Sequence, residues 1–223
     1  MKSHLRADDA FAFACGRCGR CCAGQAIGLN AYEILRLARR LDITTGAFIA
    51  AHADNAGLFL RFSPDGRCGF LGPRGCRAHP DRPLACRLYP LGLEQDAAGR
   101  AVYAPLERHP ACAGRYQRGD GAGGRLAGYL DQQGAGPYIA AAQAYQALAA
   151  EILTACAGLP AGQRDARLRP LIGDGRSPGL WLDLDAALEL DRAGAAPADP
   201  EAALARHLAA LRRWPERTLA AGA

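Results

Sequence analysis

Four cysteines lie within eight residues near the start of the chain, in the run CGRCGRCC. Cys15, Cys18 and Cys21 are each three residues apart, and this C-x2-C spacing lets thiolates converge on one metal ion or cluster. The glycines between them allow the chain to turn tightly. Cys22 directly follows Cys21, and neighbouring side chains tend to diverge. One of these two thiols is therefore expected to serve a second metal or to be a structural or reactive thiol.

Four more cysteines follow at wider spacing. A local motif with distant partners is typical of a closed metal site, because a site made by one short segment does little to hold a fold together. Independent burial would not place four cysteines in eight residues, so metal or cluster binding is favoured over disulfides or a redox relay. The predicted metal-associated set is Cys15, Cys18, Cys21, Cys22, Cys68, Cys76, Cys86 and Cys112. The ligands most strongly indicated are Cys15, Cys18, Cys21 and Cys86.

Arginines accompany these cysteines. Residues 15–22 and 65–90 contain seven arginines but only two acids, Asp65 and Asp81. Guanidinium groups near gathered thiolates lower their pKa and donate hydrogen bonds to sulfur. Arg82 and Arg87, which flank Cys86, are the candidates for contacting the bound group. The seven arginines are Arg17, Arg20, Arg67, Arg74, Arg77, Arg82 and Arg87.

Three other features of the sequence bear on this site. His79 could be a ligand, but a histidine packed beside its neighbouring proline is favoured because enough cysteines are available. Pro83 and Pro90 hold the residues before them extended, which would fix how Cys86 is presented. Cys156 stands alone at helical spacing in an Ala-rich stretch and is expected to be a small buried hydrophobic residue.

Composition restricts the class of protein. The chain has 223 residues, of which 50% are hydrophobic, and this excludes a disordered chain. Mixed charges and only 7% aromatic residues argue against nucleic acid as a partner. No run of about 18 apolar residues could span a membrane. The first 14 residues, MKSHLRADDAFAFA, lack the apolar core of a secretory signal. We therefore expect a cytoplasmic protein with reduced thiols.

The pattern of elements predicts a mainly α-helical protein with an irregular, cysteine-rich metal-binding core and small β-hairpins. Residues 1–118 are expected to form the metal-binding domain, and residues 125–223 a helical segment packed on it, with GDGAGG at 119–124 as the linker. Helices are expected at 31–41, from 44 or 45 to about 53, and at 137–157, 184–192 and 200–213. Hairpins are expected from 58–62 to 70–71 and from 91–94 to 102–105.

The ordered cysteines resemble a known family. CGRCGRCC, a following helix with Glu33, then RCGFL, GC, CRLYP and a later cysteine look like the YkgJ-type cysteine-cluster family, which is named for its CxxCxxCC motif. The resemblance covers residues 13–115 and implies a domain that chelates zinc or iron. The related flagellin lysine methylases carry a similar cysteine set and are associated with an iron–sulfur cluster. Residues 125–223 match no motif and contain no glycine-rich loop of a cofactor-binding sheet.

The metal could be zinc or iron. Two zinc ions in four-thiolate sites would use all eight cysteines, whereas one [4Fe–4S] cluster would use four. The C-x2-C-x2-C run with one distant cysteine, together with the resemblance, favours iron–sulfur. The formal net charge is 27 − 22 = +5. Two zinc ions on eight thiolates would lower it to about +1, and one cluster on four thiolates to about +3. The arginine excess is thus interpreted as counter-charge for sulfur.

Three functions are consistent with this sequence. The favoured one is a metal-binding module whose C-terminal helices bind a protein partner. The second is an enzyme in which the cluster supports modification of a protein or small molecule, although no catalytic triad or carboxylate pair is recognisable. The third is a thiol redox or metal-sensing protein that uses a spare thiol of the Cys21–Cys22 pair.

Overall fold

The computed structural model describes residues 4–116, 124–174 and 178–220, without the side chains of residues 215–220. Two units are formed, each from two separate stretches of the chain. The cysteine unit comprises Met1–Ile27 and Phe62–Gly136, and the helical unit comprises Gly28–Arg61 and Pro137–Ala223. The expected linker lies outside the described residues except for Gly124. The expected domains 1–118 and 125–223, and the packing of one on the other, stay predictions.

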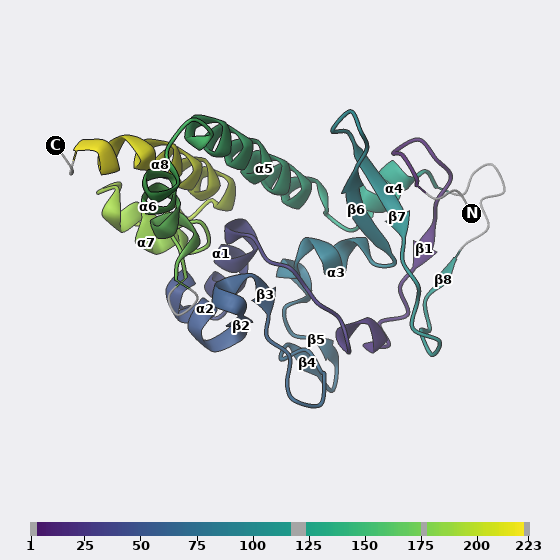
Figure 1. The fold of residues 1–223 in the computed structure, drawn as a ribbon. Helices are drawn as coiled ribbons and strands as arrows, with labels where there is room; N and C mark the ends of the chain where they lie inside the picture. The colour runs from purple at the N-terminus through teal and green to yellow at the C-terminus, as the bar shows by residue number, and fades with distance from the viewer. Residues whose placement is uncertain (1–3, 117–123, 175–177, 221–223) are drawn as a thin grey trace. The chain divides into compact units, whose positions relative to one another are not determined.

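The helical unit contains the long helices of the chain (Figure 1). Helix α1 begins as expected with a capping box, in which the Asn30 side chain accepts from the Glu33 amide at 3.0 Å and the Glu33 carboxylate accepts from the Asn30 amide at 2.8 Å. Leu35 of α1 packs with Leu184 and Leu188 in one buried cluster. The helices are α1 (Ala31–Arg40), α2 (Thr45–His52), α5 (Gly136–Cys156), α6 (Ala161–Ile172), α7 (Leu184–Leu190) and α8 (Pro200–Ala220), with the short pair β2 (Ala53–Asp54) and β3 (Phe59–Leu60) and the 3-10 turn η2 (Asn55–Gly57).

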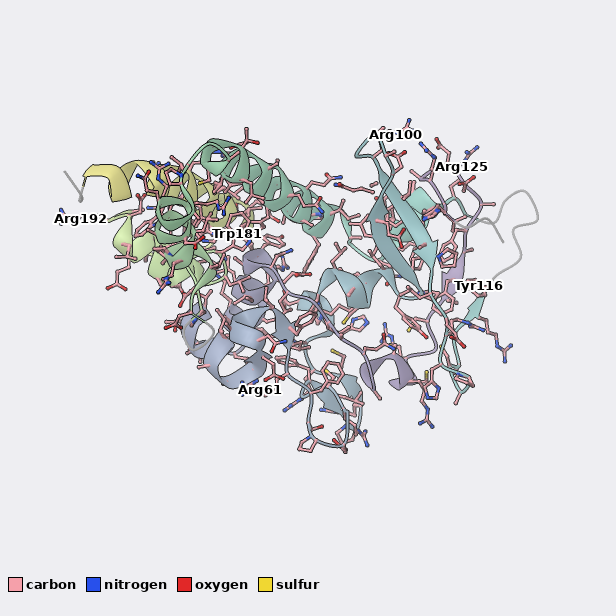
Figure 2. The ribbon with its side chains drawn as sticks, viewed as in Figure 1. Arg61, Arg100, Tyr116, Arg125, Trp181 and Arg192 are labelled. Atoms are coloured by element: carbon pink, nitrogen blue, oxygen red, sulfur yellow. The ribbon has the colours of Figure 1, made fainter. Side chains whose placement is uncertain are left out.

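A histidine is buried in the core of this unit. His207 is fully buried, contacts the Tyr145 hydroxyl through Nδ1 at 2.7 Å, and lies 2.8 Å from the Leu180 carbonyl through Nε2. Tyr145 also packs against Trp181, which is labelled in Figure 2. Burial lowers the pKa of His207 to about 4, so the folded protein keeps this ring neutral.

This buried histidine predicts acid sensitivity of the helical unit. An unfolded histidine takes up a proton near pH 6.5, whereas His207 in the folded state resists protonation until about pH 4. The contribution of the neutral ring to the free energy of unfolding is therefore fully present above pH 6.5. It is lost as the pH drops toward 4, by about 3 kcal/mol in total. Urea unfolding of wild type and His207→Gln between pH 7 and 4.5 measures the effect. A pH dependence equal in the two proteins would contradict it.

The cysteine unit is made of short elements. Its strands form two-stranded antiparallel sheets, in which β1 pairs with β8, β4 with β5 and β6 with β7. The expected 91–94 to 102–105 hairpin is confirmed, with Leu91 opposite Pro105, and Asp96 and Gly99 forming its turn. Figure 2 labels Arg100 beside this turn. The elements are β1 (Phe13–Ala14), β4 (Leu71–Gly72), β5 (Gly75–Cys76), β6 (Leu91–Gln95), β7 (Ala101–Pro105), β8 (Arg115–Tyr116), α3 (Leu84–Leu88), α4 (Leu126–Gln132) and the 3-10 turns η1 (Arg20–Cys22) and η3 (His79–Asp81).

The other expected hairpin, from 58–62 to 70–71, was wrong in its pairing. β3 pairs with β2 instead, so residues 59 and 60 lie opposite 54 and 53. Only Phe62 keeps the expected role, since it forms an isolated antiparallel bridge with Cys68. The turn itself is as expected, because the Ser63 amide donates to the Arg67 carbonyl at 2.9 Å. Cys68 is thus delivered by the predicted turn without the predicted strand pair.

The mainly α-helical class with small hairpins is confirmed. Among the described residues, no helix is both long and apolar enough to cross a membrane. Cys156 is 1% exposed on α5, as expected for a core residue.

Candidate metal centre

All eight cysteines of the predicted set belong to the cysteine unit, and none of the eight is in a disulfide. Chain position and contacts sort the eight into two groups. The first group is Cys15, Cys18 and Cys112. Pairing of β1 with β8 brings the segment that starts at Cys15 alongside the segment that contains Cys112. The thiols of Cys18 and Cys112 are hydrogen-bonded to each other, and the Ala113 amide donates to the Cys18 sulfur at 3.4 Å.

Two glycines permit this close approach. A Cβ on Gly16 would lie 2.9 Å from Ala113, and a Cβ on Gly114 would lie 2.3 Å from the Phe13 ring. Arg108 fixes the same corner, since its guanidinium stacks on Phe13 at 5.9 Å and on Tyr116 at 4.9 Å and donates to the Gly114 carbonyl at 2.7 Å. Tyr116 is labelled on β8 in Figure 2. The first group is therefore held by backbone contact and cation–π packing.

The second group is Cys21, Cys22, Cys68, Cys76 and Cys86. Residues 22–24 run alongside residues 66–68, with the Cys68 amide donating to the Cys22 carbonyl at 2.8 Å. The electrostatic partners of Cys22 include Cys68 and Cys86, and those of Cys68 include Cys76. The adjacent thiols of Cys21 and Cys22 are hydrogen-bonded to each other, although neighbouring side chains were expected to diverge. Both cysteines belong to the 3-10 turn η1.

Arg82 supplies positive charge to the second group. It lies within electrostatic reach of Cys21, Cys76 and Cys86 and is about half buried. Its Nη1 donates to the His79 carbonyl at 2.7 Å and contacts His79 Nδ1 at 3.3 Å. This placement agrees with the predicted role of Arg82 in balancing thiolate charge, while its contact with a bound group stays a prediction.

Arg87 has a different environment. It is 5% exposed, and each of its three guanidinium nitrogens donates to a backbone carbonyl. The acceptors are Arg82 at 2.9 Å, Gln133 at 2.7 Å and Pro80 at 2.5 Å. Arg87 therefore holds the backbone around Cys86, and its predicted contact with a bound group stays a prediction.

Hydrogen bonds and burial set the thiols apart chemically. The Cys22 thiol donates to the Cys21 sulfur, which lowers the pKa of Cys21 to about 7 and raises the pKa of Cys22 far above its ordinary value. The Ala113 amide lowers the pKa of Cys18, whereas burial raises the pKa of Cys68. With a pKa of about 7, the Cys21 thiol ionises near neutral pH.

The Cys21–Cys22 pair predicts a pH profile. In metal-free protein, Cys21 should be alkylated by iodoacetamide above about pH 7 and protected below it, because only the thiolate reacts. Cys22→Ala removes the hydrogen-bond donor to Cys21. The pH midpoint of Cys21 alkylation should then move upward, toward the pKa of an ordinary thiol. Fragment-ion mass spectrometry across pH 5–10 separates the two positions, with Cys76→Ala as the matched control. Superimposable pH profiles of Cys21 alkylation in wild type and Cys22→Ala would show that the Cys22 thiol does not lower the pKa of Cys21.

The donor set fits a thiolate-bound metal or cluster, because soft thiolates suit zinc and iron–sulfur chemistry. Cys15 and Cys21 also lie within electrostatic reach of the Tyr129 hydroxyl, whose pKa burial raises. Within residues 4–116, 124–174 and 178–220, however, no three Cys, His, Asp or Glu side chains are arranged as a ready-made metal site. The structure therefore brings the thiols into one unit and into groups, and the ligand set itself stays a prediction.

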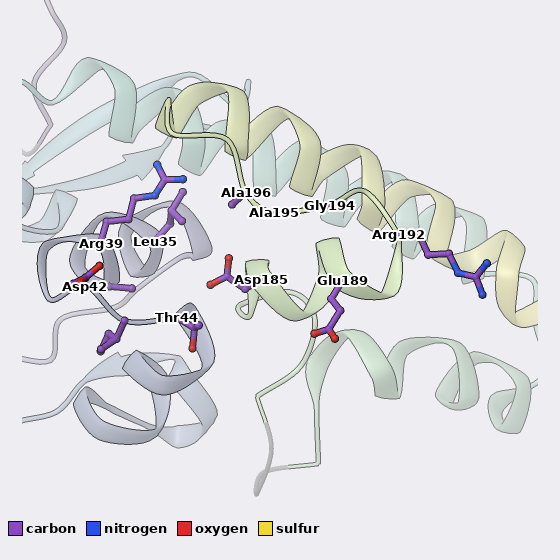
Figure 3. Close-up of a pocket in the computed structure, with 12 residues that line it drawn as sticks. Leu35, Arg39, Asp42, Thr44, Asp185, Glu189, Arg192, Gly194, Ala195 and Ala196 are labelled. Carbon is purple, nitrogen blue, oxygen red and sulfur yellow. The ribbon is translucent and has the colours of Figure 1, made fainter.

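A pocket of about 940 Å³ lies elsewhere, in the helical unit. Figure 3 shows Leu35 and Arg39 of α1 on one side of it and Asp185 of α7 on another. Arg39 donates to the Ala198 carbonyl at 2.8 Å, and Asp185 accepts from the Thr45 amide at 2.8 Å. Its described lining contains no cysteine, so the pocket is separate from the thiol chemistry.

Comparison with family models identifies the cysteine pattern. Residues 14–105 match the CxxCxxCC family. Its description is "Putative zinc- or iron-chelating domain", and this match confirms the resemblance seen in the sequence. Metal binding through the cysteines is accordingly supported. The comparisons with curated proteins and with solved structures gave no match.

Several residues that support the CxxCxxCC thiols were not found by sequence reasoning. Arg108 and Gly114, which close the first group, lie beyond the matched region, as does Cys112. Tyr89 lies within it, and its hydroxyl bonds the Cys112 thiol and accepts from the His109 amide at 3.2 Å. Gly114, two residues after Cys112, is the one of these with a usable sequence signal, because a cation–π stack or a carbonyl acceptor leaves no motif.

Proposed function

We propose that this protein is a metal-binding module in which cysteine thiolates hold a [4Fe–4S] cluster. The observation that carries the proposal is the gathering of eight free thiols in one unit whose cysteine pattern matches a zinc- or iron-chelating family. Cys15, Cys18, Cys21 and Cys86 are the proposed ligands. Cys15 and Cys21 share the environment of Tyr129, and Arg82 reaches both Cys21 and Cys86. When bound, such a cluster supplies one-electron redox chemistry or a structural cross-link.

Zinc is the second candidate, and the grouping of the thiols favours it. Cys22, Cys68, Cys76 and Cys86 would form one four-thiolate site. The first group with Cys21 would form the other, because Cys21 lies within reach of Cys18. Two tetrahedral zinc ions would then use the whole set.

Anaerobic purification with metal analysis and an absorption spectrum tests both candidates. About four iron atoms per chain with a broad band at about 400 nm would support the cluster. Two zinc ions per chain without colour would overturn the cluster and support the zinc arrangement. If neither the wild-type chain nor the Cys156→Ser control carries iron or zinc, metal binding itself would be overturned.

Two further roles are proposed beside metal binding. Large exposed aliphatic side chains on the helical unit, Leu153, Ile172 and Leu190, support a protein partner bound there. A lowered pKa at Cys21 supports the alternative of a redox or metal-sensing thiol. Uniform protection of all eight thiols from alkylation in holo protein would exclude the sensor. A cytoplasmic location suits thiols that are not in disulfides. An enzyme in which the cluster supports modification of a protein or small molecule stays the alternative ranked second, ahead of the sensor.

A further inference from the structure

Helix α4 lies beyond the family match yet contacts the backbone that carries Cys86. It presents Tyr129 and Gln133, which are four residues apart and therefore on the same side of a helix. Tyr129 is 4% exposed, and the neighbouring Gln132 is exposed. Both Tyr129 and Gln133 form hydrogen bonds with the segment around Cys86.

Gln133 ends α4 in a geometry that frees its own carbonyl. The Ala135 amide donates to the Leu130 carbonyl at 3.0 Å, and the Gly134 amide donates to the Asp131 carbonyl at 2.9 Å. This is a Schellman motif, with Gly134 in the left-handed region at φ 59°. The Gln133 carbonyl is then turned out of the helix and accepts from Arg87 Nη1 at 2.7 Å.

The Gln133 side chain reaches the other flank of Cys86. Its amide oxygen Oε1 accepts from Arg82 Nη2 at 2.8 Å. One residue thereby fixes Arg82, four positions before Cys86, and Arg87, one position after it. Since Arg82 lies within electrostatic reach of Cys86, the bond also sets where that positive charge sits.

Tyr129 caps the short helix that contains Cys86. Its hydroxyl donates to the Tyr89 carbonyl at 2.7 Å and lies within 3.4 Å of the Leu88 carbonyl. The last carbonyls of a helix have no partner within the helix, and α3 has only five residues. Such a helix is not stable by itself, so its orientation depends on contacts of this kind.

We propose that Tyr129 and Gln133 are positioning residues that aim the Cys86 thiolate at the bound metal and hold the Arg82 charge beside the ligand thiolates, so that the functional metal-binding unit includes helix α4 and the residues up to 135. The inference rests on the proposed metal-binding function. It assigns a role to a segment that lies outside the matched residues 14–105. Residues that orient metal ligands typically affect metal affinity 10- to 100-fold when changed.

The test uses the full chain, purified anaerobically with its metal. Gln133→Leu keeps the size of the side chain but removes the acceptor for Arg82, and Gln132→Leu is the matched control on the exposed neighbour. Release of the bound metal to an excess of chromophoric chelator should be about 10-fold faster in Gln133→Leu than in Gln132→Leu. Gln133→Glu keeps an acceptor for Arg82 and should restore slow release.

Thiol mapping separates positioning from general loss of stability. In Gln133→Leu holo protein, N-ethylmaleimide should label Cys86 faster while Cys112, which lies outside the four proposed cluster ligands, keeps its wild-type rate. If Gln133→Leu fails to fold, Tyr129→Phe replaces it as the test variant. It keeps the aromatic ring but removes the hydroxyl, and it should show the same selective labelling of Cys86. Equal release rates and equal Cys86 labelling in Gln133→Leu and Gln132→Leu would overturn the inference. A wild-type chain without metal would instead overturn the proposed function on which it rests.

Discussion

Removal of the bound metal is expected to unfold the cysteine unit while the helical unit stays folded. The cysteine unit has strands of two to five residues, and its helices α3 and α4 have five and seven residues. Helices and strands this short are not stable in isolation. In small metal domains the binding free energy is folding free energy, on the order of 10 kcal/mol for structural zinc. The helical unit, with two helices of 21 residues, has its own buried core.

Hydrogen exchange read by mass spectrometry measures this difference within the intact chain. After chelation, amide protection should fall over residues 13–27 and 62–116 and persist in α5 and α8. Cys86→Ser should resemble the chelated protein, whereas Cys156→Ser, which changes a buried thiol of the helical unit, should retain its metal. Unchanged protection in the cysteine unit after proven loss of metal would show that the metal does not hold this unit together.

The sequence predicts elements whose signals are local. The Asn30–Glu33 capping box and the turn of the β6–β7 hairpin were predictable, because both depend on residues within a few positions of each other. The pairing of residues 58–62 was not predictable, since alternating hydrophobic residues indicate a strand without naming its partner. Helix α6 was missed because Pro170 and scattered polar residues obscure its pattern.

The candidate site also contains some features that the sequence predicts and others that it does not. Cysteine identity and spacing indicated the donor set, and arginine placement indicated the counter-charge. The residues that orient these groups act through backbone carbonyls or ring faces, which leave no pattern in the sequence. Arg87 illustrates this: charge placed it near the cysteines in the sequence, whereas its three bonds to backbone carbonyls had no sequence signal, and its contact with a bound group stays a prediction.

Arg87→Leu is expected to destabilise the cysteine unit by about 3 kcal/mol or more, since hydrogen bonds to charged groups are worth about 1.5–3 kcal/mol each. The change leaves the carbonyls of Pro80, Arg82 and Gln133 without this donor in a site that is 5% exposed. Those carbonyls belong to η3, to the approach to α3 and to the end of α4, so three segments lose one anchor at once. Arg87→Lys should recover only part of the loss, because an ammonium group cannot span a planar three-way fork.

Denaturant unfolding of the holo protein, followed by exchange at the amides of residues 84–88, measures the Arg87 effect. Arg74→Leu is the matched control, because Arg74 is an exposed arginine of the same unit in the β4–β5 turn. Arg74→Leu should change stability by no more than about 0.5 kcal/mol. Similar losses in the two variants would mean that Arg87 contributes as general charge, and the carbonyl anchor would then not be what holds Cys86 in place. A selective loss in Arg87→Leu, with faster exchange confined to residues around Cys86, is the result that the buried fork requires.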